Sequence, residues 1–396
     1  MIQISPETQL FIREHSSDDV RVLALQAKKY PDINMPTAIT QIAGRQVAAE
    51  KIPSWREIEE IWYPKHLSLE QCSSEITARY KARLFQGDSL TDLTGGFGID
   101  CSFLATGFKS ATYVERQEEL CEIAAHNFPI LNLNHINVRN EDGVAYLQTM
   151  SPVDCIFLDP ARRNEHGGKT VAISDCEPNV AELEALLLNK ANRVMIKLSP
   201  MLDLSLALKE LKHTQEVHIL SVNNECKELL ILLGQTSPAE ITIHCVNLFT
   251  KGTQEEQHFV FTREQEQRSQ CTYTDSLGDY LYEPNASLLK AGAFRSIAAA
   301  YPVRKLHPNS HLYTSDTFIE NFPGRIFRIV NQCSFNKKEV KENLADLKKA
   351  NVTVRNFPAT VAELRKRLHL TEGGDTYLFA STLNNGQKVI IRCEKV

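Results

Sequence analysis

The sequence predicts an α/β protein with a Rossmann-like, seven-stranded core, preceded by a helical N-terminal domain and followed by an α+β domain. From Asp88 onward, short apolar runs alternate with helix-like stretches, which is typical of a doubly wound parallel sheet. The loop Asp92–Gly98 ends the first strand, Glu115 ends the second, and Asp159-Pro160 follows a later strand. Since the carboxyl ends of parallel strands form the ligand edge of such a sheet, these features predict a nucleoside cofactor beside an acidic turn that faces a substrate.

The length of the chain predicts more than one domain. Its 396 residues exceed the size of one ordinary hydrophobic core. Changes in the hydrophobic pattern predict a helical N-terminal domain over residues 1–80, a cofactor-binding core over 81–236 and an α+β domain over 237–396.

Composition and targeting signals favour a cytoplasmic protein. The first residues lack a basic-then-apolar signal pattern, and no apolar run approaches the roughly 20 residues that span a bilayer. The ten cysteines are scattered and none forms C-x-x-C, so we expect reduced thiols, no disulfide framework and no metal site. No membrane partner is expected.

Charge is distributed unevenly along the chain. Residues 290–396 contain 18 Lys and Arg against 9 Asp and Glu, a balance of +9 within a total of −5, which leaves −14 for the other residues. A basic region beside an acidic one favours a polyanionic partner for the C-terminal domain. Basic tails also occur without such a partner, so both interpretations stay open.

The N-terminal domain is expected to be helical. Ser16 or Ser17 can cap a helix that continues through residues 20–27, and helical patterns recur over 37–50 and 74–85.

The core is expected to alternate strands and helices. Strands are expected at residues 89–93, 110–115, 136–139, 153–158, 193–198, 216–222 and 228–233, with helices at 117–127, 180–188 and 204–212.

The C-terminal domain reads as α+β. Strands are expected at 241–248 and 258–262, then a polar loop at 263–270 and a helix at 286–299. Further on, strands are expected at 326–330, 352–355, 376–381 and 389–393, with helices at 337–349 and 360–368. Leu383-Asn384-Asn385-Gly386 predicts a hairpin between the last two strands.

The glycine-rich loop and the acids near it have the chemistry of a nucleoside site. Gly95, Gly96 and Gly98 let the backbone pass close under a ligand where a Cβ would clash. Glu115 can accept both hydroxyls of a ribose. Asp142, after the third strand, stands where an adenine amine can be read.

Two other nucleotide sites fit less well. A nicotinamide site needs a third small residue in G-x-G-x-x-G/A, and counting from Gly96 and Gly98 that position is Cys101, a partial match. A P-loop is excluded because no Gly-Lys-Ser/Thr follows the glycines. A structural glycine turn with a chance acid is the remaining alternative, and the later Asp-Pro turn disfavours it.

At these residues the chain resembles the class I S-adenosylmethionine-dependent methyltransferases, over about residues 70–235. The residues that carry the resemblance are Asp92, Thr94, Gly95, Gly96 and Gly98 in the first motif, Glu115 and Asp142 in the ribose and adenine motifs, and Asp159-Pro160 in the substrate-side motif. The resemblance implies S-adenosylmethionine as the cofactor. Thr94 replaces the first glycine of the commonest pattern, and several RNA-modifying members of the family also have a residue other than glycine there.

Two narrower resemblances refine this expectation. Residues 73–78, Ser-Ser-Glu-Ile-Thr-Ala, are similar to a helix of the guanine-N2 cap hypermethylases, which implies that Thr77 contacts the methionine end of the cofactor. Asp159–Arg163 together with 373–379 resembles bacterial methyltransferases that bear a C-terminal THUMP-like domain. This resemblance implies an RNA partner, tRNA or rRNA, bound through the basic C-terminal domain.

The Asp-Pro turn predicts an acid that positions the nucleophile. Asp159 can accept the hydrogens of an exocyclic base amine and hold its lone pair toward the methyl group, with Pro160 shaping the turn. Arg162 and Arg163 stand where an aromatic residue is usual. They can hold a phosphate or stack on a base, or they can be solvated surface arginines.

Methylation of an RNA base nitrogen is therefore the predicted activity, with other chemistries left open. Uridine-C5 methylation is disfavoured because residues 195–200 contain no cysteine nucleophile. Ribose 2′-O-methylation combines two lysines with an aspartate and a glutamate, and Lys81, Asp159 and Lys197, with Glu225 or Glu228, occur in a suitable order. A non-catalytic RNA-binding factor on the same scaffold is the alternative of another class.

Overall fold

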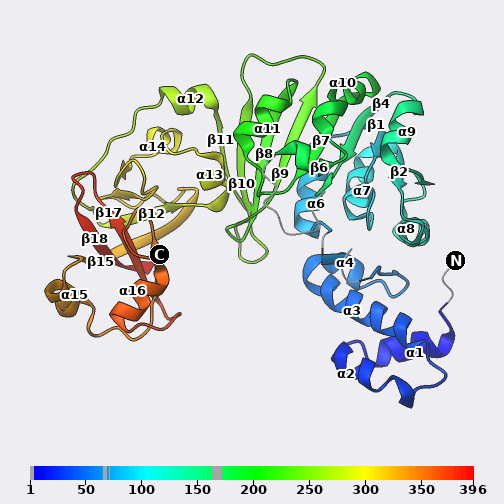
Figure 1. Cartoon of the computed structure of the whole chain (residues 1–396), viewed down its shortest axis with the longest axis horizontal. Coiled ribbons are helices and arrows are strands. Elements are labelled where there is room, and N and C mark those ends of the chain that lie inside the picture. The colour runs from blue at the N-terminus through cyan, green and yellow to red at the C-terminus, as the bar shows by residue number, and fades with distance from the viewer. Residues whose placement is uncertain (1–3, 66–68, 71, 163–171) are drawn as a thin grey trace. The chain divides into compact units, whose positions relative to one another are not determined.

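The computed structural model describes residues 4–65, 69–70, 72–162 and 172–396 (Figure 1). Backbone hydrogen bonds join nine strands into one sheet, in the order β11-β10-β8-β9-β7-β4-β1-β2-β3. The chain divides into two compact units, Met1–Gln215 with Leu229–Pro238, and Glu216–Glu228 with Ala239–Val396. No helix in the described part of the chain is long and apolar enough to cross a membrane.

The N-terminal region is helical, as the sequence predicts. Its helices are α1 (Pro6–Glu14), α2 (Val20–Leu25), α3 (Met35–Lys51), α4 (Pro53–Arg56) and, directly before the sheet, α6 (Glu75–Ala82), with a 3-10 turn η1 (Ala27–Lys29). Helix α1 was not expected, although Ser5 caps it and Pro6 begins it. The prediction that Ser16 or Ser17 caps α2 was wrong, because Asp19 accepts the Arg21 N–H instead.

The expected core strands are all present, although β8 lies mostly in the second unit. They are β1 (Gly87–Asp92), β2 (Phe108–Glu115), β3 (Ile136–Asn140), β4 (Val153–Leu158), β7 (Ala191–Leu198), β8 (Thr214–Val222) and β9 (Glu225–Gly234). Strands β3, β2, β1, β4 and β7 are parallel, and β9 runs antiparallel to β7. The helices between them are α7 (Ile99–Leu104), α8 (Glu118–Ile130), α9 (Gly143–Thr149), α10 (Val180–Lys190) and α11 (Leu204–Glu210). There are also two 3-10 turns, η2 (Ala105–Gly107) and η3 (Ile173–Asp175), and two short strands, β5 (Ala161–Arg162) and β6 (Cys176–Glu177).

The strand order creates a switch point between β1 and β4. The chain runs outward from β1 through β2 to β3 and then returns to place β4 on the other side of β1. In open parallel sheets, ligands bind at the carboxyl ends of the strands at such a point. The ends of β1, β2 and β4 carry the three features that the sequence analysis singled out.

The second unit contains most of β8, then β10 (Thr242–Leu248), which is parallel to β8, and β11 (Glu256–Thr262), which is antiparallel to β10. The polar loop expected at 263–270 is wrong, because residues Arg263–Arg268 form α12. Thr262 and Gln265 form a capping box that starts this helix. The single helix expected at 286–299 is also wrong, since Gly292, at φ +76°, separates α13 (Ala286–Ala291) from α14 (Ser296–Ala300).

A second sheet forms the C-terminal part, in the order β13-β14-β12-β15-β18-β17-β16. Its strands are β12 (Tyr280–Pro284), β13 (Arg304–Lys305), β14 (Tyr313–Ser315), β15 (Gly324–Ser334), β16 (Asn351–Val354), β17 (Thr376–Thr382) and β18 (Lys388–Lys395). The predicted hairpin joins β17 to β18, with Gly386 at φ +86°. Helices α15 (Lys337–Leu344) and α16 (Val361–Leu368) share one apolar cluster with a face of this sheet, through Leu344, Leu364, Leu378 and Ile390 among others.

Candidate active site

The glycine-rich loop joins β1 to α7 at the switch point. Gly96 has φ +54° and Gly98 has φ +85°, in the left-handed region that glycine adopts most readily. Gly95 faces the Tyr113 ring so closely that a Cβ would lie 2.2 Å from a ring carbon. The turn therefore needs glycine at these positions and keeps its backbone close to the edge of β2.

Glu115, at the end of β2, is in direct contact with this loop. Its Oε2 accepts the Gly96 N–H at 2.9 Å and its Oε1 accepts the Gln117 N–H at 2.8 Å. The residue is only 8% exposed. The structure thus brings together the loop and the acid that the sequence analysis paired across 19 positions.

Asp92 and Thr94 connect the loop to the Asp-Pro turn. Asp92 Oδ1 accepts the Thr94 N–H at 3.0 Å, and Thr94 Oγ1 accepts the Asp159 N–H at 2.6 Å. The hydroxyl explains why threonine stands where many such loops have glycine. Burial raises the pKa of Asp92 well above its ordinary value, and the nearby Asp100, Asp159 and Glu115 carboxylates add to this effect.

The carboxylate of Asp159 lies against Lys197 at the end of β7. Lys197 Nζ is 2.6 Å from Asp159 Oδ2 and 3.3 Å from Asp100 Oδ2, and it donates to Ser73 Oγ at 3.0 Å. The Asp159 side chain is 36% exposed, whereas Lys197 is 11% exposed. The ion pair with the buried Lys197 therefore fixes the Asp159 carboxylate, which remains partly accessible to solvent.

A fully buried lysine continues this network. Lys81, on α6, has no exposed side-chain surface; its Nζ is 2.9 Å from Asp100 Oδ1 and donates to Ser73 Oγ at 2.9 Å. Ser73 donates in turn to Asp100 Oδ2 at 2.7 Å. Burial by itself would raise the pKa of Asp100, but the Lys81 and Lys197 ammonium groups outweigh it and hold that pKa well below its usual range.

Ser73 and Asp100 belong to this network but were not among the site residues predicted from the sequence. Ser73 stands in the hypermethylase-like segment, and Asp100 lies two positions after Gly98, in the first turn of α7. An acid so close to a cofactor loop was a usable signal. Its lysine partners come from α6 and β7, however, and only the folded chain shows that they meet.

The remaining predicted residues have other contacts. Asp142 caps α9, accepting the Val144 and Ala145 N–H groups at 3.0 Å each. Thr77 is 2% exposed and donates to the Ser74 carbonyl at 3.1 Å; among the described contacts none joins it to the glycine-rich loop.

The turn itself is described only in part. Pro160 is buried, and Ala161–Arg162 pairs with Cys176–Glu177. The Arg162 side chain and the whole of Arg163 lie outside the described residues. Two glutamates were considered for ribose methylation. Glu225 is exposed, and its Oε1 lies 2.7 Å from Lys227 Nζ, whereas Glu228 is buried.

Comparisons with known proteins show which proteins the chain resembles. Family models match a ferredoxin-like domain over residues 280–323 and a THUMP domain-like region over 324–395. A crystal structure titled "putative methyltransferase from Porphyromonas gingivalis W83" is 34% identical, with a TM-score of 0.87 and 100% of both chains covered. The strand order and the glycine-rich loop are those of the class I methyltransferase fold. The chain belongs to the family of the P. gingivalis protein, class I methyltransferases with a C-terminal THUMP-like domain.

More distant structures match smaller parts of the chain. M. capricolum TrmK in complex with S-adenosyl-homocysteine is 12% identical, with a TM-score of 0.32, over 41% of this chain and 68% of that one. An rRNA methylase from Streptococcus thermophilus is 13% identical, with a TM-score of 0.30, over 40% of this chain and 94% of that one. No curated protein matches the chain.

Proposed function

We propose that the protein transfers a methyl group from S-adenosylmethionine to RNA, at a base nitrogen of tRNA or rRNA. The observation that carries the proposal is the position of Asp159. Its backbone is hydrogen-bonded to Thr94 of the glycine-rich loop, while its carboxylate is held by Lys197 and stays 36% exposed. An accessible acid therefore stands beside the loop that would hold the methyl donor.

The residues around the loop fit this cofactor. Gly95, Gly96 and Gly98 form a backbone cradle, and Glu115 offers a carboxylate for ribose hydroxyls. Asp92 Oδ2 is buried with no hydrogen-bond partner in the described part of the chain, and buried polar atoms usually have one. When bound, the sulfonium supplies an electrophilic methyl group.

Two further cofactor contacts rest on the family resemblance. We assign Asp142 to the adenine side and Thr77 to the methionine end. Asp142 is exposed at the start of α9, directly after β3, so its position at the ligand edge supports the first of these assignments.

Asp159 would act on the nucleophile by accepting its hydrogens. The lone pair of an exocyclic base amine is delocalised into the ring, and a carboxylate that accepts an N–H hydrogen bond orients that lone pair toward the methyl group. Lys197 restricts the carboxylate to one orientation. Arg162 and Arg163, next along the chain, are proposed to contact the phosphate or the base.

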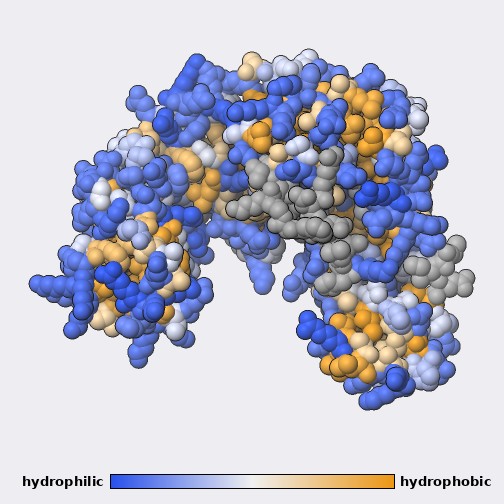
Figure 2. Space-filling view, in the orientation of Figure 1, coloured by the Kyte–Doolittle hydropathy of each residue, from blue (hydrophilic) through white to orange (hydrophobic). Residues whose placement is uncertain are grey.

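The RNA part of the proposal rests on charge. Residues 324–395, which match the THUMP-like model, contain 14 Lys and Arg against 7 Asp and Glu. Helices α15 and α16 and the segment after α15 expose a set of cations, which are Lys337, Lys338, Lys341, Lys348, Lys349, Lys366 and Arg367. Figure 2 shows hydrophilic residues over the outer edge of this region, where α15 lies. Such a surface suits sequence-independent contacts to phosphates.

Removing part of this surface is expected to weaken RNA binding and its dependence on salt. The triple variant Lys337→Ala/Lys338→Ala/Lys341→Ala should lose about tenfold in affinity for tRNA at physiological salt. Each phosphate contact contributes roughly 0.7–0.9 to the slope of log K against log salt, so the slope should become shallower by about two units. Filter binding or fluorescence anisotropy over a salt series measures both quantities. Arg21→Ala/Lys28→Ala/Lys29→Ala, which removes three exposed cations of the N-terminal region, is the matched control and should bind like the wild type.

Ribose 2′-O-methylation is the second candidate, and one observation favours it. Lys81, Asp159 and Lys197 lie in one connected network with Ser73 and Asp100. A lysine in contact with an aspartate at the substrate edge can assist removal of a hydroxyl proton as well as position an amine.

One experiment separates these functions. Purified protein is incubated with methyl-labelled S-adenosylmethionine and total RNA from cells that lack the gene, and the digested nucleosides are analysed by mass spectrometry. We expect one labelled nucleoside whose methyl group stays with the base on fragmentation. A methyl group that stays with the ribose identifies the second candidate. Absence of label from every RNA, while RNA and cofactor both bind, identifies a non-catalytic binding factor.

A further inference from the structure

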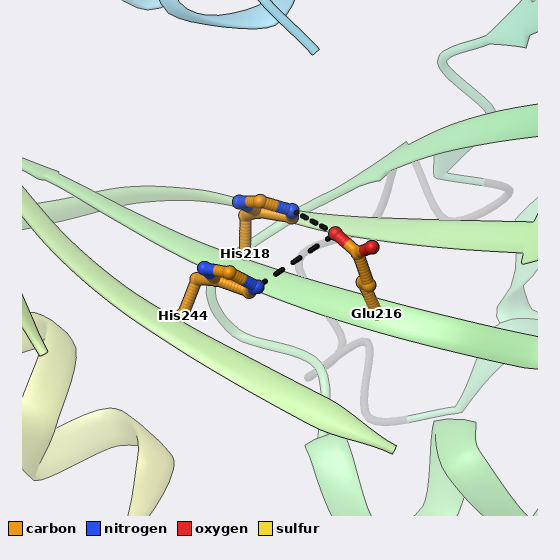
Figure 3. Close-up of side chains that lie close together, drawn as sticks. All are labelled: Glu216, His218 and His244. Atoms are coloured by element: carbon orange, nitrogen blue, oxygen red, sulfur yellow. Dashed lines mark hydrogen bonds and ion pairs between the residues drawn. The ribbon is translucent and has the colours of Figure 1, made fainter. Parts of the chain in front are cut away.

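Two histidines and a glutamate converge on one face of the second unit. Glu216 and His218 are two positions apart on β8, so their side chains share a face of the sheet. His244 stands directly opposite His218 on β10, and Thr242 stands opposite Glu216. Figure 3 shows the two imidazole rings side by side, with one nitrogen of each directed to the Glu216 carboxylate.

The separations of these atoms suit the ligands of one metal ion. Glu216 Oε2 is 3.2 Å from His218 Nε2 and 3.7 Å from His244 Nε2. Two ligand atoms that each lie about 2.1 Å from a tetrahedral Zn²⁺ are about 3.4 Å apart, which falls between the two observed distances. The rings are parallel within 8°, with centroids 4.3 Å apart, and both Nε2 atoms face Glu216 Oε2.

A third histidine orients the second. His244 Nδ1 lies 3.1 Å from His258 Nε2, on β11. A histidine that binds a metal through one ring nitrogen usually donates a hydrogen bond from the other. With the Nδ1 proton of His244 donated to His258, the lone pair of Nε2 faces Glu216 and His218.

We propose that Glu216, His218 and His244 bind one divalent transition-metal ion, Zn²⁺, with water completing its coordination. Imidazole nitrogens and a carboxylate oxygen are ligands that Zn²⁺ takes in proteins, and three protein ligands leave a fourth position open. Burial supports this arrangement, because the His218 side chain is 3% exposed while His244 and Glu216 are 19% and 46% exposed. The buried ligand is thus held in place and solvent reaches the open side.

The proposed site is independent of the methyl-transfer site and was not predicted. No metal site was expected from the sequence, because its cysteines form no ligand pattern. Glu216-Val217-His218 is a short signal, but the third ligand is 26 residues further on and joins the others only through the pairing of β10 with β8. An ion held there would join these two strands.

The test is a metal titration of the full chain, purified without a histidine tag and dialysed against a chelator. Isothermal titration calorimetry with Zn²⁺ should give one equivalent per chain. Co²⁺ in place of Zn²⁺ should give the visible absorption of a nitrogen- and oxygen-ligated ion, without the near-ultraviolet thiolate bands that binding to any of the ten cysteines would produce.

Variants at the two solvent-accessible ligands, Glu216 and His244, test whether Zn²⁺ binds at this site. Glu216→Gln and His244→Gln should each weaken Zn²⁺ binding at least tenfold, with circular dichroism unchanged. His369→Asn replaces an exposed histidine at the end of α16, whose φ of +52° asparagine tolerates, and should bind like the wild type. Zn²⁺ affinity that is equal in the wild type and in either ligand variant, or a thiolate-type Co²⁺ spectrum, would overturn the proposal.

Discussion

Asp159→Asn is expected to lower the rate of methyl transfer by about 10²–10⁴-fold, the range for loss of a positioned acid or base. Asparagine keeps the shape of the side chain but no longer pairs as an anion with Lys197, which lies 2.6 Å from the carboxylate. Its amide also offers hydrogens where the nucleophile needs an acceptor. Single-turnover rates with labelled S-adenosylmethionine measure this effect apart from binding.

Glu115→Ala provides the contrasting result. Glu115 holds the Gly96 backbone and is assigned to the ribose, and a hydrogen bond to a charged group contributes roughly 1.5–3 kcal/mol. Cofactor affinity should therefore fall about 10–100-fold in this variant, while Asp159→Asn should bind the cofactor within a few fold of the wild type. Calorimetry with S-adenosylhomocysteine measures both. An Asp159→Asn enzyme with wild-type turnover would show that this acid does not position the nucleophile.

The sequence predicted the position and the backbone of the glycine-rich loop well because its signals are local. The need for glycine at positions 96 and 98 follows from their left-handed backbone, and a strand end followed by an acid was enough to find Glu115. Helix α12 was missed for the opposite reason. Its residues are polar, and its start depends on the Thr262–Gln265 capping box, which in the sequence looks like a loop.

Networks that join distant segments could not be predicted in this way. Ser73, Lys81, Asp100 and Lys197 come from the segment before α6, from α6, from α7 and from β7. In the sequence Ser73 and Asp100 look like ordinary polar residues. Lys81 and Lys197 were named only as members of a possible ribose-methylating set, and no pattern showed that they share Asp100 and Ser73. Their meeting depends on the way α6 and α7 pack together and on the crossover that places β7 beside β4.

Lys81→Met is expected to destabilise the first unit by about 3 kcal/mol, at the lower end of the cost of breaking a buried ion pair. Methionine fills a similar volume but removes the ammonium group of Lys81. Asp100 then keeps only its contacts with Lys197 and Ser73. In a unit of this size, 1 kcal/mol shifts the unfolding midpoint by about 2–4 °C, so the midpoint should fall by roughly 6–12 °C. Thermal unfolding followed by circular dichroism and by calorimetry measures the shift.

Acid pH gives this prediction a second readout. The pKa of Asp100 is held below its usual range, so its ion pairs stabilise the fold above about pH 4, where an unfolded aspartate is ionised. That contribution is lost as the pH falls toward the folded pKa. In Lys81→Met one of the lowering charges is gone and the pKa of Asp100 rises toward its unfolded value. The loss of stability should therefore still begin near pH 4, but it should be smaller and complete at a higher pH than in the wild type.

The double variant Lys81→Met/Asp100→Leu separates the ion pair from packing. Replacing both partners of a buried pair by apolar residues is often neutral, and Lys197 keeps its contact with Asp159. The double variant should therefore recover much of the stability that Lys81→Met loses, and it should lack the acid-side loss of stability that Asp100 contributes. If the two single changes instead add, the cost of Lys81→Met comes from lost packing around α6, and the charge network does not stabilise the site.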